Sequence, residues 1–331
     1  MPRSKIFIGD PFIIQFNLTN KCISKCSYCY LKKEKDNNIN FQDLKKFLLK
    51  FQKWAAIYGF KMHVNLTGGD LWLHPEIGEI CDFIYAQDYI KKISLLINSL
   101  WFPGSREIIT RLRKKIDVVQ INTDIVQNSL NDILFFKREN ISVAAKIMLS
   151  GHNTYNNIDK QVEIIQQLKK IHHQLLVSVD RFCPYTRKDC GYVLENDALI
   201  RTIKKIKDKF TFFISDDPLV NTILSRSKEK IIKNTPNFLY ACIVPNGGLA
   251  VYPNGSIKLC SRLPTHQTGF DIKNFHLLNY LQKFSSIRDT IIEQCSGCKF
   301  FYPCGGGCLA TSYCKNNKFM KDINCLRNCH K

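Results

Sequence analysis

Short apolar runs alternate with amphipathic stretches along the first half of the chain, and this alternation limits the possible folds more than any other feature. Residues 12–16 form an apolar run typical of a buried parallel strand. In residues 40–55, apolar side chains recur at helical spacing. Further strands are expected at residues 62–66, 93–97, 118–121, 141–148 and 175–179, and further helices at 75–85, 103–114, 129–138 and 157–170. Strands that alternate with helices through short loops predict a parallel α/β fold.

Polar side chains follow several of the expected strands at the point where each strand ends. They are Asp70, Asn98, Asn122, Asp124 and Arg181. In parallel α/β folds, ligands bind at the carboxyl ends of the strands. These residues are therefore candidate ligand-binding residues.

Three cysteines, Cys22, Cys26 and Cys29, follow the first expected strand in a C-x3-C-x2-C pattern. Thiolates this close together on one loop suit a metal cluster that takes soft sulfur ligands. A structural zinc site needs a fourth ligand nearby, and the loop shows none. Three thiolates would hold a [4Fe–4S] cluster and leave one iron open.

The cysteine pattern, with Tyr28 before the third cysteine and Leu66-Thr67-Gly68-Gly69-Asp70 after the second strand, resembles the radical S-adenosylmethionine (SAM) enzymes. The resemblance implies that the open iron binds SAM, which is cleaved to a 5′-deoxyadenosyl radical that abstracts hydrogen from a substrate. It also implies an open (β/α)6 partial TIM-like barrel within the α/β class, because six units are too few to close a barrel.

The same resemblance assigns possible roles around SAM. Gly68, Gly69 and Asp70 would contact the methionine amino group, although the motif usually ends in Glu, and an ordinary turn capped by Asp70 is the alternative. The remaining assignments place Tyr28 along the adenine, Asn122 and Asp124 at the ribose or carboxylate, Arg181 against the carboxylate, and Asn98 as a further contact. Packing for Tyr28 and a surface position for Arg181 remain alternatives, and no catalytic base is identified.

Cysteines return in number after residue 240, where Cys242 and Cys260 flank a Pro/Gly-rich segment whose Pro-Asn-Gly-Ser predicts a hairpin. A C-x2-C-x5-C-x3-C run follows, with Cys314, Cys325 and Cys329 beyond it. This order, with Gly255 four residues before Cys260, resembles the SPASM domain of a subset of radical SAM enzymes. The resemblance divides the chain into a barrel at 1–183, a helical connector at 184–239 and a small cysteine-rich SPASM domain at 240–331.

The SPASM resemblance implies two auxiliary [4Fe–4S] clusters. One would use Cys295, Cys298, Cys304 and Cys325, and the other Cys242, Cys260 and Cys308. The second set lacks a fourth ligand, so its iron could bind a substrate thiolate, or Cys314 or Cys329 could complete it; Cys329 also competes with Cys325. Cys81, Cys183 and Cys190 are interpreted mainly as packing residues, although the last two could be thiols near the site. One or two structural zinc sites are the alternative reading of the C-terminal pattern.

The chain has 15 cysteines, which in a reducing cytosol indicate metal ligation rather than disulfides. A formal charge of +20 would attract an acidic peptide, a phosphate-bearing ligand or nucleic acid, or it reflects solvated helix faces. No apolar stretch resembles a signal peptide or reaches the ~18 residues that span a bilayer. We therefore expect a cytoplasmic protein with no membrane partner.

These features together predict a radical SAM/SPASM oxidoreductase that modifies a ribosomal peptide or protein by crosslinking, epimerisation or oxidation. An acidic leader segment would be read by the barrel, the connector or a partner protein, because the first strand begins by about Phe12. Flavodoxin or ferredoxin would supply the electron. A radical SAM dehydrogenase or mutase acting on a small molecule is one alternative, and a zinc-bearing nucleic-acid-binding protein is the other.

Overall fold

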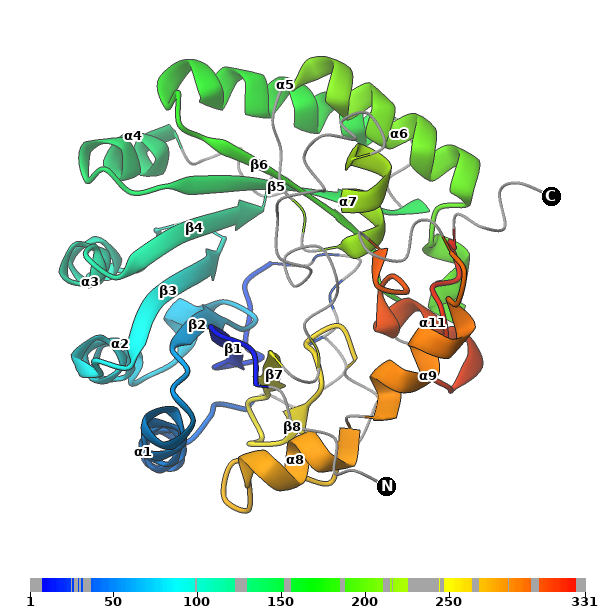
Figure 1. Ribbon diagram of the computed structural model, residues 1–331. Helices are drawn as coiled ribbons and strands as arrows, with labels where there is room; N and C mark the ends of the chain where they lie inside the picture. The colour runs from blue at the N-terminus through cyan, green and yellow to red at the C-terminus, as the bar shows by residue number, and fades with distance from the viewer. Residues whose placement is uncertain are drawn as a thin grey trace. The chain divides into compact units, whose positions relative to one another are not determined.

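The computed structural model of the chain folds into two compact units (Figure 1). Unit 1 contains residues 1–144, 171–174 and 244–285, and unit 2 contains residues 145–170, 175–243 and 286–331. The structure describes residues 8–24, 26, 29, 31, 37–98, 100–122, 130–151, 156–184, 188–210, 215, 217–225, 244, 247–263, 268–284, 286–298 and 304–325.

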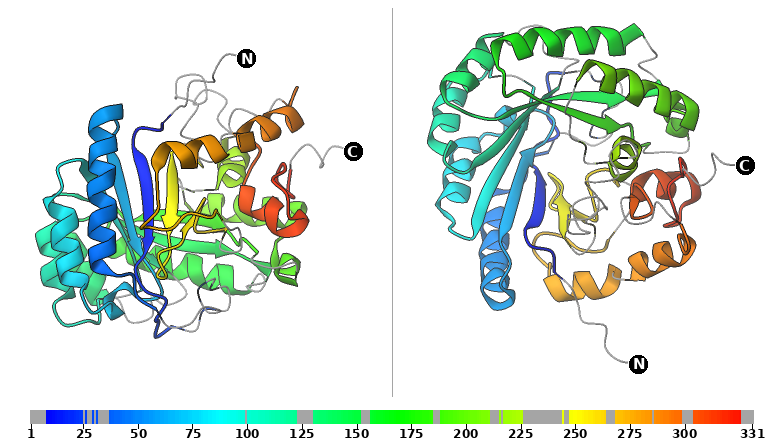
Figure 2. Two further views of the ribbon diagram at one scale, coloured as in Figure 1. Left: turned by 90° about the horizontal axis from the view of Figure 1, so that it is seen from below. Right: turned by 45° about the horizontal axis from the view of Figure 1, so that its top comes forward.

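Unit 1 alternates strands and helices along the chain. Its elements are β1 (Phe12–Asn17), α1 (Phe41–Tyr58), β2 (Met62–Thr67), the 3-10 helix η2 (Leu71–Leu73), α2 (Ile77–Ala86), β3 (Ile90–Ile97), α3 (Ser105–Leu112), β4 (Ile116–Asn122), α4 (Leu130–Arg138), β7 (Gly248–Val251), β8 (Ile257–Lys258) and α8 (Leu277–Phe284). Strands β1 to β4 pair in parallel, each with the next. Strand β7 pairs in parallel with β1 and antiparallel with β8, so the order in this unit is β4-β3-β2-β1-β7-β8 (Figure 2).

Helix α1 shows how the core of unit 1 forms from the sequence. The Asn40 side chain accepts a hydrogen bond from the Asp43 amide at 3.0 Å, which begins the helix, and Gly59 ends it with a φ of 72°. The face that carries Phe47 and Phe51 is buried against β1. Ring centroids lie 5.6 Å apart between Phe12 and Phe51. This apolar contact holds α1 on the strand that leads into the cysteine loop.

Unit 2 contains most of β5 (Val143–Leu149), whose first two residues belong to unit 1. Its other elements are α5 (Asn156–Ile171), β6 (Leu176–Arg181), the 3-10 helix η5 (Lys188–Tyr192), α6 (Asn196–Lys209), α7 (Pro218–Ser225), α9 (Ser286–Gln294) and α11 (Leu309–Asn316). Strand β6 neighbours β5. The Phe182 amide donates to the Leu149 carbonyl at 2.8 Å, just beyond the carboxyl ends of both strands.

The expected strands and helices of the first 181 residues are present, with ends that differ by a few residues. The helix expected from Pro103 begins at Ser105, because Gly104 adopts a left-handed conformation with a φ of 87°. The predicted hairpin is present as β7 and β8, but the sequence did not indicate that β7 extends the parallel sheet beside β1. The proposed boundaries at 183 and 239 remain predictions.

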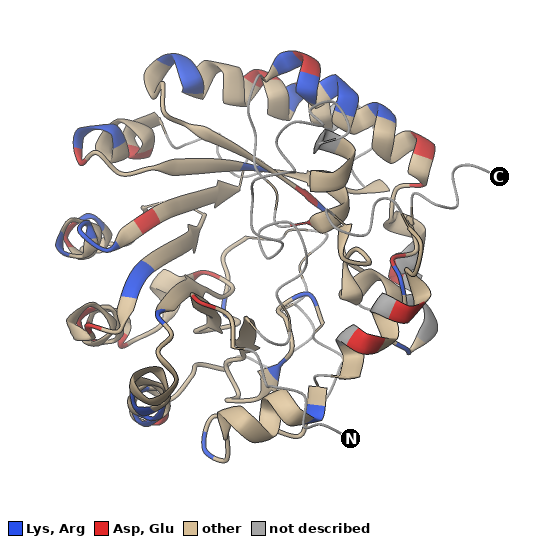
Figure 3. Ribbon diagram, viewed as in Figure 1, with Lys and Arg blue, Asp and Glu red and all other residues tan. Residues whose placement is uncertain are grey.

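Charged residues lie mainly on the helices, including α5 and α6, whereas the strands carry few of them (Figure 3). In the part of the chain that the structure describes, no helix combines the length and the apolar character needed to cross a membrane.

Candidate functional site

The cysteine loop begins where β1 ends, and the turn after β2 is hydrogen-bonded to it. The Gly69 amide donates to the Thr19 carbonyl at 2.6 Å, and the Asp70 amide donates to the Lys21 carbonyl at 2.7 Å. The Gly-Gly-Asp turn therefore lies directly against the residues that precede Cys22.

Both glycines of this turn are required by the close approach of the two backbones. A Cβ at Gly68 would lie 2.5 Å from the Thr19 carbonyl oxygen, and a Cβ at Gly69 would lie 2.2 Å from the Lys21 carbonyl oxygen. Real Cβ atoms do not approach backbone oxygen so closely. The sequence predicted that the glycines admit a ligand, and the structure shows that they admit the backbone of the cysteine loop.

Asp70 is buried at the start of η2 and its carboxylate has two donors in the protein. Oδ1 accepts from the Trp72 amide at 3.3 Å, and Oδ2 accepts from the Trp101 indole Nε1 at 2.7 Å. Burial raises the pKa of Asp70, while the Trp101 and Trp72 donors lower it by a smaller amount. Asp70 therefore caps the start of η2, as the alternative interpretation of this turn predicted. Its carboxylate still has lone pairs available for another donor.

Cys22 lies near Asp70 and near polar side chains from the loop and from the end of β3. Asn98 Nδ2 donates to Ser24 Oγ at 3.3 Å and lies 3.8 Å from Cys22 Sγ, which also accepts from the Ser24 amide at 3.3 Å. Desolvation raises the pKa of the Cys22 thiol, the Ser24 amide lowers it, and the charges of Asp70 and Cys29 raise it further. The structure therefore brings four predicted site residues together: Cys22, Cys29, Asp70 and Asn98.

The other members of the predicted SAM site are placed less completely. Cys26 is half-buried and its carbonyl accepts from the Cys29 amide at 3.2 Å. Asn122 is the last residue of β4. Tyr28 and Asp124 lie outside the described residues.

Three soft thiols on one loop are a donor set that fits an iron–sulfur cluster. Cys22 is exposed, and Cys29 packs beside Leu31, Ala250 and Tyr252, so one side of the loop is accessible and the other is supported by unit 1. Within the described residues, no three Cys, His, Asp or Glu side chains already stand as a metal site. Cluster binding would therefore draw the thiols together.

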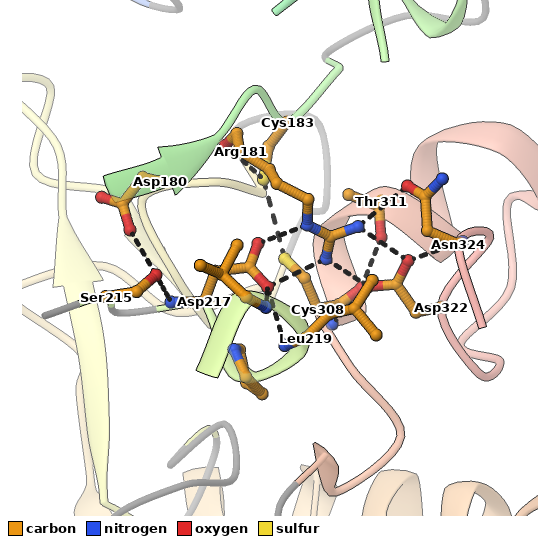
Figure 4. A network of polar contacts seen from close by, with 12 residues as sticks. Asp180, Arg181, Cys183, Ser215, Asp217, Leu219, Cys308, Thr311, Asp322 and Asn324 are labelled. Atoms are coloured by element: carbon orange, nitrogen blue, oxygen red, sulfur yellow. Dashed lines mark hydrogen bonds and ion pairs between the residues drawn. The ribbon is translucent and has the colours of Figure 1, made fainter. Parts of the chain in front are cut away.

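Arg181 does not occupy the position predicted for it. Its side chain is 2% exposed and binds two buried carboxylates (Figure 4). Nε and Nη2 donate to Asp217 at 2.8 and 3.0 Å, and Nη1 and Nη2 donate to Asp322 at 3.1 and 2.6 Å. A second bond from Nη1 reaches Asn324 at 2.9 Å. Because this guanidinium is fully engaged within unit 2, we assign it a structural role and withdraw it as a ligand of the SAM carboxylate.

Unit 2 also gathers cysteines of the first predicted auxiliary set. Burial raises the pKa of Cys304 to about 12, and the charges of Asp322, Cys325 and Cys295 contribute in the same direction. The Cys298 amide donates to the Cys295 carbonyl at 3.0 Å, which keeps these two residues in one turn. All four cysteines belong to unit 2, but no three of them already stand as a metal site in the described part of the chain, and their role as cluster ligands remains a prediction.

The second predicted set is described only in part. Cys242 lies outside the described residues, and Cys260 belongs to unit 1, where its Sγ accepts from the Arg262 amide at 3.3 Å. Cys308 belongs to unit 2 and is buried there. Its Sγ lies 3.6 Å from that of Cys183.

Sequence reasoning missed several residues of these regions. Trp101 and Ser24 contact Asp70 and Cys22 from positions with no motif. Asp217 and Asp322 lie far from Arg181 in sequence, and a buried arginine could not have been distinguished from a surface one without the tertiary structure. Only Ser24 carried a signal in the sequence, because it lies between two cysteines of the predicted cluster loop.

The chain is similar in sequence to known proteins. Residues 16–148 match the Radical SAM superfamily. Over 158 residues the chain is 25% identical to the antilisterial bacteriocin subtilosin biosynthesis protein AlbA of Bacillus subtilis (strain 168), a match that covers 46% of this chain but only 33% of AlbA. Over 229 residues it is 22% identical to a probable GTP 3′,8-cyclase of Methanocaldococcus jannaschii, covering 67% of this chain and 69% of that protein.

Solved structures share the fold across nearly the whole chain. Streptococcus suis SuiB bound to precursor peptide SuiA has a TM-score of 0.69 at 18% identity and covers 97% of this chain and 77% of its own. Native anSMEcpe with bound AdoMet has a TM-score of 0.69 at 15% identity and covers 96% of this chain and 95% of its own. The predicted α/β partial barrel is thereby confirmed. Residues 16–148 are thus similar in sequence to the radical SAM superfamily, and the chain shares its fold with these solved structures.

Proposed function

We propose that this chain is a SPASM-type radical SAM enzyme that abstracts hydrogen from a ribosomally made peptide or protein. The observation that carries the proposal is the turn at Gly69 and Asp70, which is bonded to the backbone just before Cys22. This contact joins the predicted cluster loop to the predicted SAM-binding turn. The similarity to AlbA and the fold shared with peptide-bound SuiB support a peptide substrate.

Each residue of the site would have a separate role in binding the cluster or SAM. Cys22, Cys26 and Cys29 would hold a [4Fe–4S] cluster, which supplies one electron and an open iron for SAM. Asp70, already oriented by the Trp101 indole, would accept a hydrogen bond from the SAM ammonium group. Asn98 would donate toward the sulfur of Cys22 and the groups bound beside it.

Further parts of the proposal come from the sequence pattern. One auxiliary cluster would be held by Cys295, Cys298, Cys304 and Cys325. Another would have Cys242, Cys260 and Cys308 as ligands. The excess of positive charge suits an acidic leader segment. A flavodoxin or ferredoxin of the cytoplasm would supply the electron. The abstraction would lead to crosslinking, epimerisation or oxidation of the substrate.

The test is the formation of 5′-deoxyadenosine by protein that has been purified and reconstituted anaerobically. Reduced protein is incubated with SAM, with and without peptides encoded beside its gene, and the products are measured by mass spectrometry. We expect 5′-deoxyadenosine in the reduced samples, and a peptide whose mass changes when the correct substrate is present. Cys26→Ala should abolish the product, whereas Cys81→Ala, at a buried cysteine of α2, should retain it.

Two results would overturn the proposal at different levels. Intact SAM in fully reconstituted, reduced protein would refute radical SAM chemistry. If SAM is cleaved and GTP or another small molecule is converted to product, while no peptide reacts, the result would instead favour an enzyme of small-molecule metabolism. The similarity to the probable GTP 3′,8-cyclase makes that the second candidate.

A further inference from the structure

One face of strands β1 to β4 carries polar, uncharged side chains that the site described above does not use. Helices α1 to α4 lie along the opposite face of these strands, where Phe12 and Val64 are fully buried (Figure 1). Side chains alternate between the two faces of a strand, so Gln15 of β1, Asn65 of β2 and Gln120 of β4 belong to the first face, where they stay partly exposed. We call the surface formed by these three residues the carboxamide face.

The register of the strands brings the carboxamide face together within unit 1. Gln15 pairs with Asn65, and Asn65 pairs with Ser94 of β3. Gln120 lies one side-chain row further toward the carboxyl ends of the strands. The Ser261 hydroxyl donates to Gln15 Oε1 at 3.0 Å. The carboxamides therefore belong to one continuous surface of the sheet.

The carboxamide face extends to the cysteine loop. On its other side, Gln15 pairs with Ala250 of β7. Cys29 packs against the apolar group formed by Leu31, Ala250 and Tyr252. A molecule bound along the carboxamide face would thus lie beside the loop that we propose to bind the SAM cluster.

Asn65 has an acceptor atom that lacks a donor. Its Oδ1 is buried and has no hydrogen-bond partner in the described part of the chain, although the residue as a whole is partly exposed. A buried carbonyl oxygen without a donor costs free energy, and native proteins rarely retain one without a reason. The terminal torsion of asparagine is broad, so a small rotation would turn the carboxamide toward a bound N–H group.

The distribution of charge disfavours an anionic ligand on this face. The charged residues of β1 to β4 are Lys91, Lys92 and Asp117, which all lie near the amino ends of β3 and β4, and Lys92 pairs with Asp117. His63 Nε2 shares a hydrogen bond with Ser94 Oγ at 2.9 Å, and burial lowers the pKa of His63, so this imidazole is mostly neutral at pH 7. The middle of the face thus offers donors and acceptors without charge, which suits a peptide group better than a phosphate.

We propose that the carboxamide face binds an uncharged stretch of the peptide substrate, and that Asn65 accepts a hydrogen bond from a backbone amide of that stretch. The inference rests on the proposed function and deepens it, because it names the chemistry of the segment next to the reacting bond. Asn65 is then a specificity-determining residue, and the proposed acidic leader would bind elsewhere on the protein.

The experiment measures binding separately from catalysis. Fluorescein-labelled peptides encoded beside the gene are titrated with reconstituted protein and S-adenosylhomocysteine, which has no sulfonium to cleave, and fluorescence anisotropy gives the Kd. Asn65→Leu removes the carboxamide at similar volume, and Gln52→Leu, at an exposed carboxamide of α1, is the matched control. Circular dichroism and urea unfolding check that each variant folds.

We expect Asn65→Leu to weaken peptide binding about tenfold without lowering the urea midpoint, since it removes a buried oxygen that has no donor. Gln52→Leu should bind as wild type does. In a scan that places one Asp at successive positions of the peptide, binding to wild type should weaken within one short window. This scan needs no protein variant, so it tests the proposal even where a variant is unstable.

Equal affinity of wild type and Asn65→Leu would overturn the proposal. So would a peptide that tolerates Asp at every position, a wild type that binds none of the peptides, or displacement of the peptide by GTP. A protein that binds a peptide through Asn65 but modifies no peptide when SAM is supplied would refute the proposed function alone.

Discussion

Replacing Arg181 by Met should destabilise unit 2 strongly, because one guanidinium neutralises two buried carboxylates. The side chains of Asp217 and Asp322 are 0% and 1% exposed, and both would lose their cation. Removing one partner from a buried ion pair typically costs 3–5 kcal/mol. Backbone amides continue to bind both carboxylates, at Leu219 and Cys308 respectively, which limits the loss. We therefore expect a loss of about 4 kcal/mol in the free energy of unfolding at neutral pH.

The free energy of unfolding that Arg181→Met loses should be larger at neutral pH than in acid. Burial alone would raise the pKa of Asp322, but Arg181 outweighs it and holds the pKa below its usual value. In the wild type this stabilisation is present above the unfolded pKa of about 3.9 and is lost as the pH falls through the folded value. Without Arg181, burial should raise the pKa of Asp322 in the folded variant. Protonation of Asp322 in acid would then remove the unpaired buried charge and reduce the loss of stability. The difference between the two proteins should thus be large above about pH 5 and shrink below about pH 4.

Urea unfolding of reduced apoprotein at pH 7 and pH 4, followed by circular dichroism, measures both effects. Asp217→Asn in the Arg181→Met background is the matched second change, since it removes one of the stranded carboxylates and should recover part of the loss. A loss below about 1 kcal/mol at pH 7, or a deficit that grows in acid, would refute the reasoning. So would a stable Arg181→Met protein that had lost SAM binding, which is what the original prediction for this residue requires.

Three further predictions concern the site in unit 1. Gly69→Ala should destabilise the apoprotein by about 3 kcal/mol in urea unfolding, because the new Cβ would clash with the Lys21 carbonyl and disturb the two hydrogen bonds of the turn. The control Gly78→Ala, where α2 leaves open space for a Cβ, should stabilise it by up to ~1 kcal/mol. Equal effects of the two substitutions would contradict the close approach of the backbones. Trp101→Phe removes a donor that lowers the pKa of Asp70, so a carboxyl NMR titration should give a higher pKa, and an unchanged value would exclude the bond. Asn98→Ala removes a donor near the sulfur of Cys22 and should make the reduction potential of the proposed SAM cluster more negative in spectroelectrochemistry; an unchanged potential would contradict a role for this donor.

The order of elements could be predicted from the sequence alone, and so could the cysteine loop that we propose as the cluster-binding loop. Both depend on short-range pattern: apolar side chains at period 2 or 3.6 determine which segments can be buried as strands or helices, and C-x3-C-x2-C places three soft ligands on one loop whatever surrounds it. The turn at Gly68 and Gly69 was located correctly for the same reason. The sequence did not predict that the backbone of the cysteine loop lies against these glycines.

Tertiary structure alone decided which distant residues meet. The sequence could not show that β7 pairs with β1, that Asp322 joins Arg181 to Cys308, or that the sulfur of Cys183 contacts that of Cys308. Burial is the physical reason, because an arginine or a cysteine has the same local pattern whether it lies at the surface or inside. A buried polar side chain is stabilised only by hydrogen-bond or ionic partners, and the partners of Arg181 lie up to 143 positions away.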